Sequence, residues 1–156
     1  MRRTSLLIGF LFAILLPAHA GHSPPKVTLS VHVQSAGEGQ SPLEVTTITI
    51  PPDGERIQVR TLPEVTERDL IGVQQDGSGA LHLLFNHSGQ VSLNAVTAQN
   101  QGRILVVLID GYVVYAPSID QQIATGELVI PRRINAQVVQ FLQEVARQNV
   151  RQAAKT

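Results

Sequence analysis

The sequence lacks cysteine and tryptophan altogether, and it contains only two tyrosines in 156 residues. Without a thiol the chain forms no disulfide, binds no metal through a thiolate and has no cysteine nucleophile. A lipid anchor on a cysteine behind a leader is excluded for the same reason. Packing alone must therefore stabilise the fold, and a chain of this length buries enough apolar surface to form one domain.

An excess of charge of either sign is also absent, because twelve lysines and arginines balance twelve aspartates and glutamates. Two of the basic residues, Arg2 and Arg3, stand at the extreme N-terminus. Their removal would leave ten basic residues against twelve acidic ones, a net charge of −2. Domains that bind nucleic acid carry a basic surface, so we expect no nucleic-acid partner.

One long apolar run stands near the N-terminus, and none as long follows it. A basic start precedes residues Leu6 to Leu16, and Ala18-His19-Ala20 follows them. This order is typical of a secretory signal peptide. We expect residues 1–20 to be removed after Ala20, residues 21–25 to form a flexible lead-in, and the protein to be periplasmic or secreted. The run is shorter than the roughly 20 residues that span a bilayer, so we expect no stable membrane insertion after cleavage.

Residues 26–61 are predicted to form an N-terminal β unit. Apolar and polar residues alternate from Val27 to Val33, which is the pattern of a half-buried strand. Residues 43–50 are rich in β-branched side chains, and Pro51-Pro52-Asp53-Gly54 is a turn signal before a second run at residues 56–60. Two such runs around a turn predict an antiparallel pair.

Residues 62–151 are predicted to form a mixed domain of helices and strands. Thr66 and Asp69 have the spacing of a capping box, which predicts a short helix that ends near Gly72. A strand is expected over residues 80–85, followed by a second helix from Asn86 to Asn100. The apolar positions expected on the inner face of that helix are Val91, Ala95 and Ala98.

A β-hairpin is the most clearly marked element of this domain. Apolar runs over residues 103–109 and 112–116 flank the pair Asp110-Gly111, which is typical of two strands joined by a two-residue turn. Because Ile104 to Ile109 is apolar throughout, we expect this strand at the centre of a sheet with cover on both faces and helices over at least one of them. Pro117 is expected to end the pairing.

A strand over residues 127–130 and an amphipathic helix from about Asn135 to Arg151 are predicted to close the domain, before a polar, frayed tail at residues 152–156. The helix should bury one apolar stripe, made of Val138, Phe141, Leu142 and Val145. The whole pattern predicts an α+β fold. We expect one mixed, largely antiparallel sheet with a central Asp-Gly hairpin and two to three amphipathic helices packed on it.

The domain also carries an ordered set of short motifs. They are Leu62-Pro63-x-Val65-Thr66-x-x-Asp69-Leu70, Gly89, Thr97, Asn100, Gly102, Asp110-Gly111, Val113-Val114, Ala116-Pro117 and Ile123-x-x-Gly126-x-x-x-Ile130. In this order and spacing they resemble the head subdomain of the first periplasmic domain of SecD, a membrane subunit of the bacterial protein-export machinery. The resemblance implies a head-like α+β module whose associated role is contact with polypeptide. SecD also has transmembrane helices and a separate base, so we expect a freestanding module here and not a proton-driven subunit.

Five residues around the hairpin are expected to be structural. Gly102 suits a left-handed position after a helix, Gly111 completes the hairpin turn, and Gly126 opens a strand. Pro117 stops a strand. Asp110 is expected to accept hydrogen bonds within its own turn.

The two tyrosines are candidates for contact with a partner. Tyr112 and Tyr115 lie three residues apart on one strand and should face opposite sides, so that one is buried and the other exposed. An exposed tyrosine can anchor an extended peptide, with residues 119–125 flanking the groove. The partner-binding candidates are Tyr112, Tyr115, Ile119, Gln121 and Gln122. The expected partner is a polypeptide or an envelope protein, with the export machinery as one candidate.

No catalytic, cofactor or metal site is predicted. The histidines at positions 22, 32, 82 and 87 have no ligand spacing, although His32 and His82 both fall on strands and could be neighbours. No nucleophile elbow, zinc-protease motif or phosphate loop occurs. Asn86-His87-Ser88 fits a glycan acceptor, but we interpret it as a helix start.

Two other functions stay open. The chain could be a structural or assembly protein of the envelope whose N-terminal β unit adds strands to a partner, because long edge strands invite such pairing. It could also be a hydrolase whose nucleophile and histidine come together only in the fold.

Overall fold

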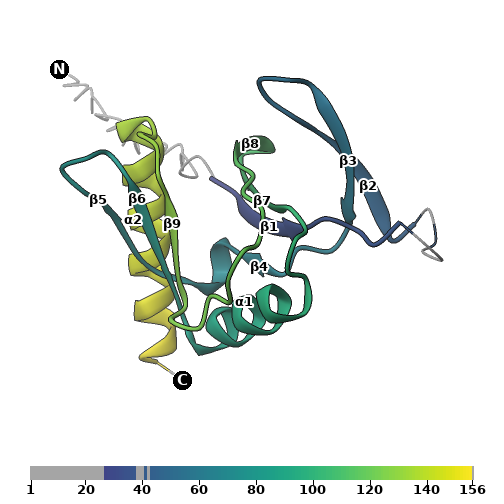
Figure 1. Cartoon of the computed structure of the whole chain (residues 1–156). Coiled ribbons are helices and arrows are strands. Elements are labelled where there is room, and N and C mark those ends of the chain that lie inside the picture. Colours follow the sequence, from purple (N-terminus) through teal and green to yellow (C-terminus); the bar gives the residue numbers. More distant parts are fainter. Residues whose placement is uncertain (1–26, 38–40, 42, 156) are drawn as a thin grey trace, which may run out of the picture.

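A computed structural model describes residues 27–37, 41 and 43–155. The predicted signal peptide and lead-in lie outside these residues. Figure 1 shows the order of elements along the chain. They are β1 (Leu29–Val33), β2 (Val45–Ile50), β3 (Glu55–Arg60), β4 (Val65–Thr66), the 3₁₀ turn η1 (Glu67–Asp69), β5 (Leu70–Gln75), β6 (Leu81–Phe85), α1 (His87–Gln99), β7 (Leu105–Ile109), β8 (Tyr112–Tyr115), β9 (Glu127–Ile130) and α2 (Ala136–Ala153).

The strands form three antiparallel sheets instead of the single sheet that the sequence predicts. A four-stranded sheet has the order β4-β1-β7-β8, a three-stranded sheet has the order β5-β6-β9, and β2 and β3 form a separate ribbon. The α+β class is confirmed. The single sheet is wrong because β9 returns beside β6 and not beside β8. The pairing of β9 with β6 joins residues far apart in the chain, and the local sequence pattern does not predict it.

β1 is an inner strand of the four-stranded sheet. It pairs with β4 on one side and β7 on the other, which puts Val31 opposite both Val65 and Val107. The alternating apolar side chains from Val27 to Val33 are buried, as predicted. The structure thus places β1 in one sheet with strands of the 62–151 segment, while β2 and β3 form the expected hairpin.

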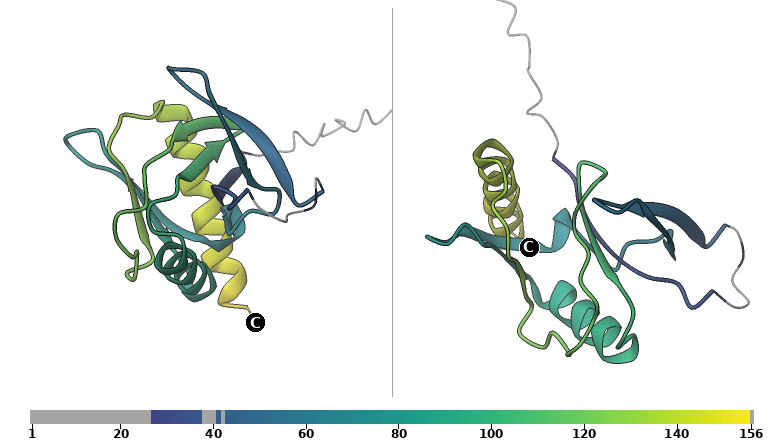
Figure 2. Two further views of the ribbon diagram at one scale, coloured as in Figure 1. Left: turned by 45° about the vertical axis from the view of Figure 1, so that its right-hand side comes forward. Right: turned by 45° about the horizontal axis from the view of Figure 1, so that its top comes forward.

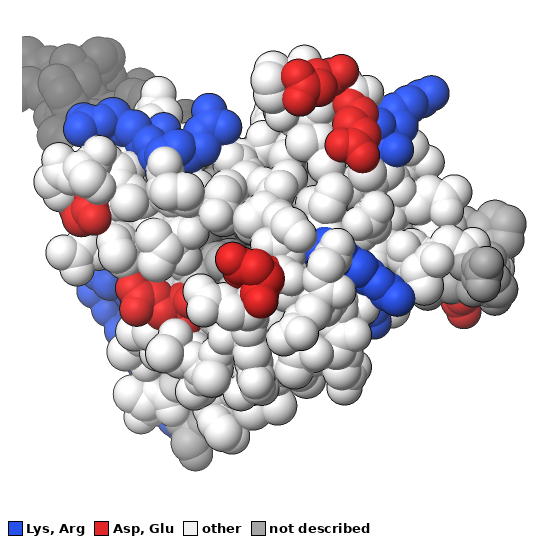
Figure 3. Space-filling view, viewed as in Figure 1, with Lys and Arg blue, Asp and Glu red and all other residues white. Residues whose placement is uncertain are grey.

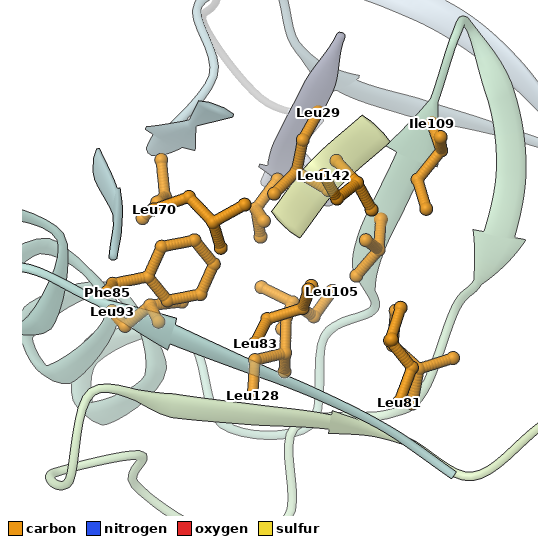
Figure 4. Close-up of a cluster of buried hydrophobic side chains, with 14 of the residues drawn as sticks. Leu29, Leu70, Leu81, Leu83, Phe85, Leu93, Leu105, Ile109, Leu128 and Leu142 are labelled. Atoms are coloured by element: carbon orange, nitrogen blue, oxygen red, sulfur yellow. The ribbon is translucent and has the colours of Figure 1, made fainter. Parts of the chain in front are cut away.

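The larger core lies between the four-stranded and three-stranded sheets. Figures 1 and 2 place these sheets on opposite sides with α1 across one end and α2 alongside β5. Figure 4 shows Leu29 and Leu105 of one sheet, Leu83 of the other and Leu142 of α2 around the same space. Each of these side chains is at most 1 % exposed. Burying one leucine stabilises a fold by about 1.5–3 kcal/mol, so this core supplies most of the apolar stabilisation.

A smaller core covers the reverse face of the four-stranded sheet. Ile57 and Val59 of β3 pack against Val106 of β7, and Leu108 and Val113 are partly buried beside them. β7 is therefore covered on both faces, as its unbroken apolar run predicts. The cover on this face is the β2–β3 ribbon and not a helix.

The hairpin turn is confirmed, with one correction. Asp110 has φ of 51° and Gly111 has φ of 79°, the left-handed pair that a type I′ turn requires. The Asp110 carboxylate does not accept within its own turn as predicted. Its Oδ1 accepts from the Thr28 N–H at 2.9 Å, so it ties the turn to the start of β1.

The capping box at Thr66 is confirmed, but the predicted helix is a single 3₁₀ turn. Thr66 Oγ1 accepts from Arg68 N at 3.3 Å, and Asp69 Oδ2 accepts from Thr66 N at 3.0 Å. The chain then enters β5 at Leu70, with Val73 opposite a residue of β6. Pairing with β6 and packing against α2 override the local helix signal.

Both α-helices form where predicted. The buried face of α1 differs from the prediction, and that of α2 matches it in part. On α1 the inner face is Leu93, Val96 and Thr97, while Val91 is 53 % exposed and the predicted alanines face solvent. On α2 the buried residues are Val139, Leu142 and Ala146, with Val138 and Phe141 half-buried. α2 also continues to Ala153, past residue 152, where the sequence predicts the tail to begin.

Candidate functional site

A cleft opens between the edge strands of the two larger sheets. The end of β8 and residues 117–121 form one wall, and β9 forms the other. Figure 3 shows a hollow between β9 and the segment that follows β8. The volume of the cleft is about 240 Å³, which is below the roughly 300–1,000 Å³ of most small-molecule sites. Its apolar lining residues are Leu105, Tyr115, Pro117, Ile119, Ile123, Leu128 and Val129.

The β9 wall presents backbone groups to the cleft. Gly126 O accepts from Phe85 N at 2.9 Å, so Gly126 faces β6. Backbone groups alternate in direction along an antiparallel strand, and Glu127 and Val129 therefore direct theirs away from β6. Both residues line the cleft.

The opposite wall also presents backbone groups to the cleft. Pro117 O accepts from Leu105 N at 2.9 Å, and Ile119 N donates to Arg103 O at 2.7 Å. Ser118, which lies between them, consequently directs its N–H and C=O away from β7. These bonds also correct the expectation that Pro117 ends the pairing, because the contact with β7 continues past it.

Three of the five predicted partner-binding residues line this cleft, namely Tyr115, Ile119 and Gln121. Gln122 lies outside the lining, and its Nε2 donates to Asn94 Oδ1 on α1. The structure thus brings Tyr115 together with the segment after β8, as expected, but turns Gln122 toward the helix.

The two tyrosines differ in exposure, as predicted, but not because they face opposite sides of the sheet. A register shift in the hairpin places Tyr112 opposite Ile109 and Tyr115 opposite Val107, and both of these partners belong to the larger core. Tyr112 is 76 % exposed, whereas Tyr115 is half-buried against the larger core. Tyr112 lines a different cleft of about 530 Å³ between the hairpin and β2. A partner in the β8–β9 cleft would therefore meet Tyr115 and not Tyr112.

Ile119 is a core residue more than a contact residue. Its side chain is only 3 % exposed, and its carbonyl accepts from Gly102 N at 2.8 Å. Gly102 has φ of 80°, which confirms the left-handed position predicted after α1. Ile119 can provide only the floor of the cleft, so its predicted contact with a partner is limited to that floor.

Gly126 has a second role that sequence reasoning missed. Its φ of 73° suits glycine, but a Cβ there would also lie 2.9 Å from Gln90 Cβ on α1. Gln90 Nε2 donates to Ala124 O at 2.8 Å and fixes the same approach. The close packing of α1 on the strand entrance has no local sequence signal.

His82 of β6 stands between two carboxylates, one of which, Glu127, lines the cleft. Its Nδ1 lies 2.7 Å from Glu127 Oε1, and its Nε2 lies 3.3 Å from Asp76 Oδ2. The hydrogen bond to Glu127, and then that to Asp76, raises the pKa of His82 above 6.5. Hydrogen bonds from Ser78 and then His82 lower the pKa of Asp76 to about 2.

His32 is held elsewhere, on β1. Its Nδ1 lies 2.9 Å from Arg60 O and its Nε2 lies 3.1 Å from Ser30 Oγ. Because a carbonyl can only accept, Nδ1 carries the proton in the neutral ring and Nε2 accepts from the Ser30 hydroxyl. His32 and His82 belong to different sheets and share no hydrogen-bond partner, so the structure does not bring together the two histidines that could have been neighbours. Within the described residues no group of three or more His, Asp or Glu side chains is arranged to bind a metal ion.

Comparison with known proteins finds similarity at the level of structure. No family model matches the sequence, and no curated protein is similar to it. A solved structure described as "Structure and function of a membrane component SecDF that enhances protein export" is 23 % identical over 78 % of this chain, with a TM-score of 0.54. A second, described as "Crystal structure of SecDF in Super-membrane-facing form", is 23 % identical over 78 % of this chain, with a TM-score of 0.55.

The chain has the fold of part of SecDF. It spans 62 % of the length of the first solved chain and 18 % of the second. The resemblance seen in the sequence motifs is thereby confirmed for the fold. Neither α1 nor α2, the α-helices of the described part of the chain, has the length and apolar character that crossing a membrane requires.

Proposed function

We propose that this chain is a polypeptide-binding module linked to protein export, and that an extended segment binds it between β8 and β9. The observation that carries the proposal is the cleft of about 240 Å³ between two edge strands, on a fold shared with a component that enhances protein export. An extended segment pairs with an exposed strand edge through its backbone, and pockets beside the edge select its side chains. Ser118 and Val129 direct their backbone N–H and C=O groups into the cleft from opposite walls.

The lining of the cleft sets the kind of segment that fits. Most lining side chains are apolar, and the charged ones, Asp120 and Glu127, are both acidic. A segment with apolar side chains and no acidic residue therefore suits the cleft best, because like charges across an interface disfavour binding. We expect weaker binding to acidic segments of equal length.

The proposed module is not an enzyme. Ser30 and His32 are within hydrogen-bond distance, but His32 is only 8 % exposed and neither residue lines the β8–β9 cleft. An active-site-directed fluorophosphonate is expected to leave Ser30 unlabelled. Labelling that Ser30→Ala abolishes would favour the hydrolase function instead.

The proposed place of action is outside the cytoplasm. The leader predicted from the sequence supports this location, and N-terminal sequencing of the protein from an exporting cell is expected to begin at Gly21. Recovery of the intact Met1 terminus in a membrane fraction would contradict the proposal of a released module.

Binding can be tested with one protein in two states. The exported chain is titrated with a reduced and alkylated protein that stays unfolded, and with the native form of the same protein. Val129→Lys puts a charge in the cleft, whereas Leu84→Lys is a matched control, because the two side chains are 39 % and 44 % exposed on the same sheet. We expect Val129→Lys to weaken binding of the unfolded form about tenfold, or about 1.4 kcal/mol, and Leu84→Lys to have little effect.

Photo-crosslinking locates the bound segment. A crosslinker at Gln121, in the cleft, is expected to capture the unfolded protein. The same group at Gln140, an exposed glutamine of α2, is the control. Equal capture from both positions, or equal affinity for the folded and unfolded forms, would contradict the proposed function.

A further inference from the structure

β2 is a second exposed strand edge, and it lies apart from the β8–β9 cleft. Figures 1 and 2 show the β2–β3 ribbon at one side of the molecule. Val45–Ile50 contains only valine, threonine and isoleucine, and its pairing with β3 continues over six residue pairs without a bulge. Proteins usually protect an edge strand with lysine, proline, a bulge or a covering element. None of the first three occurs within this strand.

The direction of the backbone groups shows which residues of β2 are available. The carbonyl oxygens of Glu44 and Ile50 accept hydrogen bonds on the β3 side, at 2.8 and 3.0 Å. Because these groups alternate along a strand, the even-numbered residues face β3. Val45, Thr47 and Thr49 therefore direct their N–H and C=O groups to the open edge.

We propose that a second copy of this chain pairs with β2 through the same edge, antiparallel, with Thr47 on the two-fold axis. In this register Thr47 lies opposite Thr47, and Val45 of each copy lies opposite Thr49 of the other. All three outward-facing residues are then hydrogen-bonded pairs, each of which exchanges both of its N–H···O=C bonds. The two ribbons become one continuous sheet.

The side chains of β2 fit this register. On the outer face the opposed residues are threonine with threonine and valine with threonine, and on the inner face Ile48 lies opposite Thr46 of the second copy. No two like charges oppose each other within the strand, and β-branched pairs are favourable across antiparallel strands. The same surface serves both copies, which is the geometry of a two-fold interface.

Apolar surface beside the edge adds to the case for association. Tyr112, 76 % exposed, lines a cleft of about 530 Å³ together with Thr47, Ile48, Thr49 and other residues of the ribbon and hairpin. Removing such surface from water favours association. Since β2 does not line the β8–β9 cleft, this dimer and the proposed polypeptide binding can fail independently.

Single cysteines in this cysteine-free chain test the register. Opposed hydrogen-bonded residues have Cα atoms about 5.5 Å apart, within the roughly 4.4–6.8 Å that a disulfide spans. Thr47→Cys is therefore expected to form a disulfide-linked dimer on mild oxidation. Thr49→Cys is the matched control, because the two copies of residue 49 would lie four residues apart along the strands, about 14 Å. Equal crosslinking of the two variants would overturn the register.

A charge substitution tests the interface without a crosslink. Thr47→Lys puts two like charges opposite each other on the axis, whereas Gln58→Lys adds the same charge to the same outer face, opposite Thr47 on β3. We expect sedimentation equilibrium to show a wild-type dimer, about tenfold weaker association of Thr47→Lys, and an unchanged Gln58→Lys dimer. Far-UV circular dichroism checks that both variants fold.

Three results would overturn the proposal. They are a wild-type chain that stays monomeric up to millimolar concentration, a dimer that Thr47→Lys does not weaken, and a strand of a different protein found on β2 in place of the second copy.

Discussion

The two faces of the four-stranded sheet differ in what covers them. One face packs against the three-stranded sheet and both helices, and that core contains large side chains such as Leu83 and Leu142 that are fully buried. On the other face, a two-stranded ribbon buries only Ile57, Val59 and Val106 among the described residues. Apolar stabilisation scales with buried area, so the first face should fix the fold and the second should be the weaker attachment.

β7 joins the part of the molecule that stabilises the fold to the part that carries the proposed dimer edge. β7 contributes to both cores, since Val107 faces the larger core and Val106 faces the ribbon. The proposed polypeptide site lies at the open edge between the two larger sheets, and the proposed dimer edge lies on the ribbon. The ribbon can therefore loosen without loss of the β8–β9 cleft, because no ribbon residue lines it.

The largest effect is expected in the larger core. Leu83→Ala removes a fully buried side chain and should lower the free energy of unfolding by about 3 kcal/mol. Leu84→Ala, its neighbour at 44 % exposure, should cost about 0.5 kcal/mol or less. Denaturant unfolding of the two variants measures the contrast, and similar losses would show that β6 does not face the core as described.

A smaller and more local loss of stability is expected in the ribbon core on the reverse face of the four-stranded sheet. Ile57→Ala should cost about 2 kcal/mol, because the side chain is 5 % exposed in the ribbon core. Amide hydrogen exchange should speed up in β2 and β3 and change little in β6. Equal loss of protection in all three strands would mean that both faces unfold as one unit and would contradict the comparison.

A substitution in the hairpin turn, which joins two strands of the four-stranded sheet, should lower the free energy of unfolding by about 1 kcal/mol or more. Gly111→Val places a β-branched residue at φ of 79°, where the backbone is strained. A Cβ at this position meets no atom within 4 Å, so the cost is conformational and not steric. Gly111→Asn should cost less, because asparagine tolerates the left-handed region. Thermal unfolding midpoints rank the two, and an unchanged midpoint for valine would contradict the turn.

The smallest effect is expected at His82, on the outer side of the three-stranded sheet. Hydrogen bonds to Glu127 and Asp76 raise its pKa above 6.5 in the folded protein, so the protonated form favours folding. This contribution is complete below pH 6.5 and is lost as the pH rises through the folded pKa. The unfolding midpoint should therefore fall slightly from pH 6 to pH 8, and the decline should vanish in His82→Gln. An NMR titration of the His82 ring with an unshifted or lowered pKa would contradict the geometry.

Asp76 provides the opposite dependence in acid. Its pKa is lowered to about 2 from 3.8, so its contribution to stability is present above pH 3.8 and is lost as the pH falls through 2. Asp76→Asn should remove that part of the acid dependence.

Local patterns predicted the elements that have strong local causes. The alternation at Val27 to Val33, the turn at Asp110-Gly111 and the helix starts at Asn86 and Asn135 are all confirmed, since each depends on residues a few positions apart. The candidate site was predicted in part, because Tyr115 and Gln121 line the cleft.

The predictions from sequence are wrong where contacts between distant residues, or buried polar side chains, determine the structure. Residues 70–75 pair with β6 in place of continuing a helix. At α1 the buried stripe includes Thr97, whose Oγ1 donates to Leu93 O at 2.6 Å. It also includes the C-cap residue Asn100, whose Nδ2 donates to Val96 O at 2.8 Å. Both side chains donate hydrogen bonds to carbonyl groups of the helix and can therefore be buried. A search for apolar residues alone does not identify the buried face of this helix.

The central claim is that an extended segment binds as a strand between β8 and β9, and amide hydrogen exchange tests it most directly. Exchange is followed residue by residue with and without the reduced and alkylated unfolded protein. The claim predicts slower exchange of the outward-facing Ser118 and Val129 amides, with the Leu83 amide, already inside a sheet, unchanged. Binding that leaves Ser118 and Val129 as fast as in the free protein would contradict it.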